Sequence, residues 1–228
     1  MKIRNSLASC LTAILFIHVA TFSAPGQAKR LIVLDDLAAL REVSEPQVSP
    51  DGEWVAYTVT TVDAAQDKKV SHIWMTSWDG RHSLQLTLGK ESEEHPRWSP
   101  DGRWLAFLSS RGDDDEVVQV WLLNRNGGEA DRITDFKGNA TDFVWSPDSK
   151  RLALIVRDED PDKRKSDKDK TTPKPIVIDR FQFKQDKVGY LRNLRDHLYV
   201  FDLATRKAEI LTPGDYDEAL VSYSLLLP

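Results

Sequence analysis

The sequence has one cysteine, Cys10, in 228 residues. It lies in an N-terminal segment that we expect to be removed, so the mature chain would have no cysteine. This excludes disulfide bonds, thiol catalysis and cysteine-bound metal from the mature protein.

Motifs and residues typical of catalytic and metal-binding sites are also few. No two of the eleven glycines are four residues apart, so the G-x-S-x-G nucleophile elbow of serine hydrolases is absent. The formal charge of -5 argues against a nucleic-acid partner. Four histidines follow the N-terminal segment, and no pair has the spacing of metal ligands: His72, His82, His95 and His197. We therefore name no catalytic, cofactor-binding or metal-binding residue and expect no cofactor.

Residues 1–28 have the pattern of a cleavable signal peptide. Lys2 and Arg4 precede an apolar run from Leu7 to Ala20 that is short for a membrane span. Gly26-Gln27-Ala28 supplies small residues at the expected cleavage site. The pattern predicts an exported protein, periplasmic or secreted, with no membrane contact after cleavage. An uncleaved membrane anchor is the alternative.

A short turn motif occurs three times after this segment. Each copy predicts a type I turn between an incoming strand and an apolar outgoing strand, with its last residue at positive φ. The copies are Ser49-Pro50-Asp51-Gly52, Ser99-Pro100-Asp101-Gly102 and Ser146-Pro147-Asp148-Ser149. Ser149 replaces glycine in the third copy, and a side chain at positive φ costs roughly 1 kcal/mol.

Two further spacings are constant along the chain. A strand-opening residue precedes a threonine by 14 positions in each unit (73 to 87, 120 to 134, 198 to 212). That threonine precedes the next aromatic by 11 positions (87 to 98, 134 to 145, 212 to 223). Repeats of this length with hairpin turns indicate the four-stranded blades of a β-propeller.

We therefore predict an all-β fold: a partial β-propeller of about three four-stranded antiparallel blades plus the start of a fourth. The incomplete propeller domain would span 29–228, with blades near 46–97, 98–144 and 145–222. The third blade carries a charged insertion near 157–190, whose balanced charges at 157–170 indicate a solvated loop. Tyr223-Ser224 begins another turn, but Leu225-Leu226-Leu227-Pro228 follows instead of the motif. This ending predicts a truncated propeller.

Several polar and aromatic groups resemble binding or catalytic sites but have structural explanations. Asp113–Glu116 suits a solvated turn better than a cation site, because it lacks the spaced ligands of a calcium loop. His72 is interpreted as a strand-packing residue, and His95 as a loop residue. The three motif serines are interpreted as turn formers. Equivalent blade positions favour core packing over an aromatic binding stripe for Trp74, Trp121 and Tyr199.

The repeats carry a family resemblance. Together with Arg180-Phe181-Gln182-Phe183-Lys184, Gly189-Tyr190 and His197-Leu198-Tyr199-Val200, they resemble the N-terminal propeller of prolyl oligopeptidase-family serine peptidases. The likeness is greatest to secreted dipeptidyl-peptidase and acylaminoacyl-peptidase-like members. The turn motif alone is also shared with TolB-type propellers.

The resemblance implies a propeller that restricts which peptides reach a separate hydrolase domain, where the catalytic residues of that family lie. We expect this chain to be inactive alone and to meet peptide substrates only in a full-length protein. In that family, acidic pairs can bind a substrate amino terminus, but the residues around Glu93 and Glu94 do not match that device.

A TolB-like periplasmic module that binds a protein partner is the alternative function. Open blade edges predict, in either case, a protein partner or self-association.

Overall fold

The computed structural model describes residues 30–112, 117–159, 178, 181, 183–185, 189–190 and 194–216. The expected signal peptide, the acidic run 113–116, most of the insertion and Tyr223-Ser224 therefore lie outside the described residues. The chain divides into two compact units, Met1–Leu37 and Ala38–Pro228. The helix α2 (Leu34–Ala38) includes their boundary. Within the described ranges, no helix is both long and apolar enough to cross a membrane.

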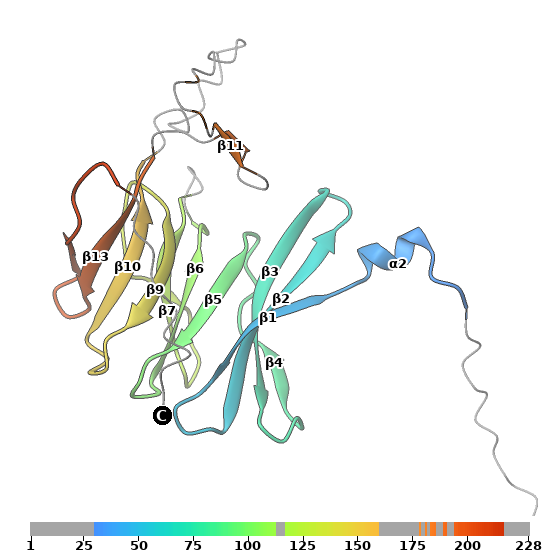
Figure 1. Cartoon of the computed structure of the whole chain (residues 1–228). Helices are drawn as coiled ribbons and strands as arrows, with labels where there is room; N and C mark the ends of the chain where they lie inside the picture. The colour runs from blue at the N-terminus through green and yellow to red at the C-terminus, as the bar shows by residue number, and fades with distance from the viewer. Residues whose placement is uncertain are drawn as a thin grey trace, which may run out of the picture. The chain divides into compact units, whose positions relative to one another are not determined.

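The second unit contains three four-stranded antiparallel sheets, which confirms the all-β prediction (Figure 1). We call them blades 1 to 3. Blade 1 consists of β1 (Glu42–Val48), β2 (Trp54–Asp63), β3 (Lys68–Ser77) and β4 (Ser83–Gln85). Blade 2 consists of β5 (Glu93–Trp98), β6 (Trp104–Ser109), β7 (Gln119–Asn124) and β8 (Asp131–Arg132). Blade 3 consists of β9 (Ala140–Trp145), β10 (Arg151–Arg157), β13 (Asp196–Asp202) and β14 (Lys207–Ile210).

Each blade begins a few residues before the limits drawn from the turn motifs, because the incoming strand pairs with the strand that leaves the same turn. Within the insertion, β11 (Lys184–Gln185) and β12 (Gly189–Tyr190) form a separate two-stranded sheet. The insertion therefore leaves the order of blade 3 unchanged, since β10 pairs directly with β13.

The blades pack through two apolar clusters. One joins blades 1 and 2 through residues such as Ile73, Trp98 and Phe107. The other joins blades 2 and 3 through residues such as Val120, Phe143 and Leu154. Because β6 contributes to both clusters, five of its six residues are buried, as the apolar outgoing run predicts. Figure 1 shows β5 between β1 and β9, and β5 contacts both of these strands.

The three motif turns share one set of hydrogen bonds. In blade 1, the Ser49 hydroxyl donates to Asp51 Oδ1 at 2.6 Å and accepts the Trp54 amide at 3.0 Å. The same bonds recur from Ser99 and Ser146. The last turn residue has φ of 74°, 70° and 58° at Gly52, Gly102 and Ser149. This confirms the predicted positive φ, including that of the serine.

Ser149 also makes a hydrogen bond to the neighbouring blade. Its hydroxyl accepts the backbone amide of Asp101, in the turn of blade 2, at 3.0 Å. This bond between blades offsets part of the roughly 1 kcal/mol of strain, since a hydrogen bond contributes about 1 kcal/mol.

We predict that Ser149→Ala lowers the free energy of unfolding by about 1 kcal/mol, because it keeps the strain and removes the bond. Ser149→Gly removes both and should be nearly neutral. Urea denaturation of the two variants and the unmodified chain measures the difference. Equal stabilities of the alanine and glycine variants would contradict this assignment.

Candidate functional site

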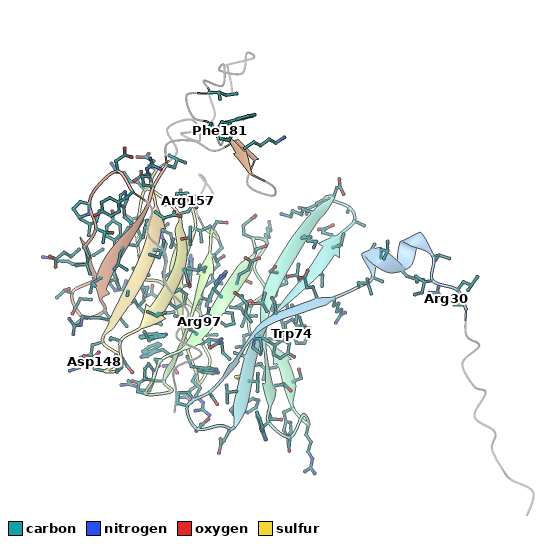
Figure 2. All side chains as sticks on the ribbon, viewed as in Figure 1. Arg30, Trp74, Arg97, Asp148, Arg157 and Phe181 are labelled. Carbon is teal, nitrogen blue, oxygen red and sulfur yellow. The ribbon has the colours of Figure 1, made fainter. Side chains whose placement is uncertain are left out.

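Hydrogen bonds link neighbouring blades at the contacts between them, which we call joints. The Trp98 indole of blade 2 donates to the Gln47 carbonyl of blade 1 at 3.3 Å. The Trp145 indole of blade 3 donates to the Arg97 carbonyl of blade 2 at 3.1 Å, and Figure 2 labels Arg97. The two bonds link equivalent positions, so the same contact joins blade 2 to blade 1 and blade 3 to blade 2.

Bulges in the first strands add a second contact to the joint between blades 1 and 2. The pairing registers of β1 and β5 shift at Glu45 and His95, where φ is 55° and 57°. The Glu45 carboxylate lies 3.1 Å from His95 Nε2 and accepts the His95 amide at 2.9 Å. Thr58 also donates to Glu45. His95 therefore lies in β5, the first and innermost strand of blade 2. The prediction that it is a loop residue was wrong.

Glu93 is a fully buried carboxylate in the same joint. Its exposed fraction is 0%. His72 Nδ1 of blade 1 lies 3.0 Å from Oε2, and Arg111 Nη1 lies 3.4 Å from Oε1. The Gly89 amide donates to Oε2 at 3.3 Å. A carboxylate that is buried and surrounded in this way is closed to a ligand, and removing it would leave its partners without a buried anion.

Arg111 extends this cluster onto an aromatic surface. Its guanidinium lies 4.0 Å from the Trp121 ring centroid and 5.5 Å from that of Phe107. The Trp121 indole donates to the Ser109 carbonyl at 3.1 Å. Trp121 also packs against the apolar cluster between blades 1 and 2. Little in the sequence indicates the role of Arg111, which lies two residues after the end of a buried strand.

A small cavity of about 260 Å³ lies between blades 2 and 3. Glu94 and His95 of β5 and Thr141 of β9 line it, together with Ser109 at the end of β6. His95 Nδ1 is buried and has no hydrogen-bond partner in the part of the chain that the structure describes. Glu94, in contrast to Glu93, faces an open space.

The motif serines are bonded within their turns. Each hydroxyl both donates to an aspartate and accepts a backbone amide of its own turn, and among the described residues no histidine is hydrogen-bonded to any of the three. Across the described ranges, no group of three or more histidine, cysteine, aspartate or glutamate side chains has a metal-binding arrangement.

The turn aspartates are held as anions. The Ser49 hydroxyl, the Glu53 amide and the Arg125 guanidinium of blade 2 lower the pKa of Asp51 to about 2. Arg125 Nη1 lies 2.5 Å from Asp51 Oδ2. The Ser99 and Ser146 turns likewise lower the pKa of Asp101 and Asp148, although burial opposes the effect most strongly at Asp101.

The comparisons with known proteins agree with this architecture. Residues 36–185 match the PD40 family, the TolB beta propeller domain. The propeller identified here is therefore of the TolB type, and the chain belongs to that family.

Curated relatives include peptidases. The chain is 42% identical over 86 residues to an uncharacterized peptidase, YuxL, of Bacillus subtilis, which covers 38% of this chain and 13% of that protein. It is 34% identical over 73 residues to dipeptidyl-peptidase 5 of Porphyromonas gingivalis. This match covers 32% of this chain and 11% of that protein. The matched segments are thus a small part of both relatives.

Solved structures share the fold. Pyrococcus horikoshii acylaminoacyl peptidase aligns with 77% of this chain and 25% of its own, at 20% identity and a TM-score of 0.56. The structure of a putative TolB from Agrobacterium tumefaciens aligns with 75% of this chain and 49% of its own, at 22% identity and a TM-score of 0.50. The resemblance to peptidase and TolB propellers is confirmed.

We predict that Glu93→Gln lowers the free energy of unfolding by about 3 kcal/mol, because it leaves Arg111 and His72 without their buried anion. Glu94→Gln is the matched control on the adjacent residue, and its effect should stay within about 0.5 kcal/mol. Chemical denaturation at pH 7 measures both. Similar losses in the two variants would show that Glu93 has no special role.

Asp51 should also make folding sensitive to acid. Because its pKa falls from its ordinary value of 3.8 to about 2 on folding, its contribution to stability is complete above pH 4. That contribution is lost as the pH falls from about 4 to 2. Asp51→Asn should therefore be less stable than the unmodified chain at pH 7 and lose less stability over this interval. Denaturation at several pH values tests the prediction, and parallel pH profiles would contradict it.

Proposed function

We propose that this chain is the substrate-restricting propeller of an exported serine peptidase of the prolyl oligopeptidase family. The observation that carries the proposal is a row of TolB-type blades whose sequence is similar to segments of two peptidases. The N-terminal pattern of residues 1–28 supports export.

The joints between blades suit a part that excludes large substrates. Each joint combines apolar packing with an indole-to-carbonyl bond, and the first joint adds Glu45–His95 and the buried Glu93 cluster. Several fixed contacts between neighbouring sheets resist their separation. A stiff row of blades would keep the width of an opening constant and so select peptides by size.

In this proposal, the residues of this chain contact the peptide, and residues outside it cleave the bond. The sequence has no nucleophile elbow, and the motif serines are committed to their turns. The cavity at Glu94 and His95 offers polar groups beside the innermost strands, where a passing peptide would meet them.

We predict that the purified chain does not hydrolyse a fluorogenic peptide library.

A second experiment tests whether the propeller restricts the size of the substrates. The coding DNA beyond the Pro228 codon should be translated in all frames for a hydrolase domain with a G-x-S-x-G elbow. Such a domain should be expressed with and without residues 29–228. Removing the propeller should raise kcat/KM for a folded or long substrate at least tenfold relative to a dipeptide. Unchanged relative rates would refute restriction, and turnover by this chain alone would refute its inactivity.

A TolB-like binding module is the second candidate, favoured by the family match and by the TolB structural likeness. It predicts that no hydrolase frame follows and that the chain captures a specific protein from periplasmic extract. The same DNA sequence therefore separates the two proposals.

A further inference from the structure

The cavity between blades 2 and 3 is formed by strands of both blades. On the blade 2 side it is lined from β5, from the end of β6 and from Val118, which precedes β7. On the blade 3 side it is lined from Ala140 and Thr141 at the start of β9. The Val118 amide donates to Asn139 Oδ1 at 2.9 Å, and the Ala140 amide donates to the Val118 carbonyl at 2.9 Å. The packing of two blades within this chain therefore fixes the shape of the cavity.

Part of the cavity wall is apolar. Leu108 and Ala140 are buried and belong to the apolar cluster between blades 2 and 3, and Val118 packs against that cluster. Placing methylene groups against such a wall is favourable, because it removes apolar surface from water. This part of the wall therefore suits an aliphatic chain.

Three hydroxyl groups that line the cavity already have hydrogen-bond partners. The Ser92 hydroxyl accepts the Ser71 amide at 3.2 Å. The Ser109 hydroxyl donates to the Ser92 carbonyl at 2.9 Å, and the Thr141 hydroxyl donates to the Ile155 carbonyl at 3.3 Å. These hydroxyl groups are therefore bonded to the surrounding fold.

Glu94 differs from these groups. In the part of the chain that the structure describes, its half-buried carboxylate lines the cavity and forms no hydrogen bond or ion pair. The basic side chains of the neighbouring joint are paired with other carboxylates, His95 with Glu45 at 3.1 Å and Arg111 with Glu93 at 3.4 Å. Glu94 therefore gives the cavity a negative charge that no described side chain balances.

The chemistry of a ligand for this cavity follows from the carboxylate and the apolar wall together. A calcium ion takes about six to eight oxygen ligands, so one carboxylate is too few. An anionic ligand would be repelled by Glu94. Lysine and arginine side chains instead join an aliphatic stem to a cationic hydrogen-bond donor. The volume of about 260 Å³ is below the roughly 300–1,000 Å³ of pockets for drug-sized ligands, so the cavity suits a single side chain.

We propose that this cavity binds the basic side chain, lysine or arginine, of a peptide. The carboxylate of Glu94 pairs with the cation, and Leu108, Val118 and Ala140 contact the aliphatic stem. This assignment rests on the proposed function, because a propeller that admits peptides brings them past its first strands. It adds a preference for basic peptides, which Glu94 determines from outside the catalytic domain.

Three peptides with blocked ends test the proposal on the full chain: acetyl-Gly-Gly-Lys-Gly-Gly-amide, its arginine counterpart and its norleucine counterpart. Norleucine keeps an aliphatic stem but lacks the cation, which is the only charge of the other two peptides. The lysine or the arginine peptide should bind at least tenfold more tightly than the norleucine peptide, because only a cation forms the charged hydrogen bond to Glu94. NMR titration measures each Kd and locates the site, and the amide signals of Val118 and Ala140 should shift.

Glu94→Gln should weaken binding of the basic peptide at least tenfold and leave the Kd of the norleucine peptide unchanged. Glu129→Gln is the matched control, because it removes the same charge from an exposed glutamate between β7 and β8. It should leave every Kd unchanged, and circular dichroism verifies that both variants are folded. Equal Kd values for the basic and norleucine peptides, equal effects of the two variants, or no binding of any peptide would overturn the proposal.

This test and the test of size restriction can fail separately. Size restriction is measured from hydrolysis rates with and without the propeller, whereas the titration measures binding by this chain. Binding of the basic peptide without size restriction would contradict the proposed function alone. Size restriction without binding of the basic peptide would contradict the role of the cavity alone.

Discussion

The turn that follows each innermost strand constrains most of the structure. A serine hydroxyl bonded to the aspartate two residues later fixes the point at which the chain reverses. That point sets the register between the first two strands, and a shift of one residue would exchange the buried and exposed faces of the strand. The same turns also carry groups that a neighbouring blade binds, such as Asp51 for Arg125 and the Asp101 amide for Ser149. Local geometry and blade packing are thus joined in one motif.

The joints combine nonpolar packing, which has little directional preference, with a few polar contacts that have strict geometry. Apolar clusters would allow neighbouring sheets to slide, whereas the indole-to-carbonyl bonds allow one position only. The buried Glu93 acts in the same way, because its two oxygens have defined partners on both blades. Such buried ionic groups contribute less to net stability than to a unique arrangement of the neighbouring sheets.

The repeats made the architecture predictable, but not the polar contacts within it. Constant spacings and turn residues were sufficient to identify four-stranded units, the positive φ of Ser149 and the family resemblance. Glu93 and Glu94 are adjacent and identical in type, yet one is enclosed and the other faces a cavity. The reason is that successive side chains of a strand point to opposite faces, which the sequence could show only once a strand had been assigned there. The register shift of β5 follows, between Glu94 and Arg97, and this bulge, together with the proline after His95, is why a loop was expected at His95.

The sequence by itself determined the number of blades in the described part of the chain, the turn chemistry and the strand order. These properties depend on neighbours along the chain, so a short motif is sufficient to encode them. Only the tertiary structure decided which charged groups meet. His72 and Glu93 are 21 residues apart and His95 and Glu45 are 50 residues apart, and their contacts arise because separate sheets are stacked. The pairing of such groups depends on the angle between blades, which is set by the packing of many side chains at once.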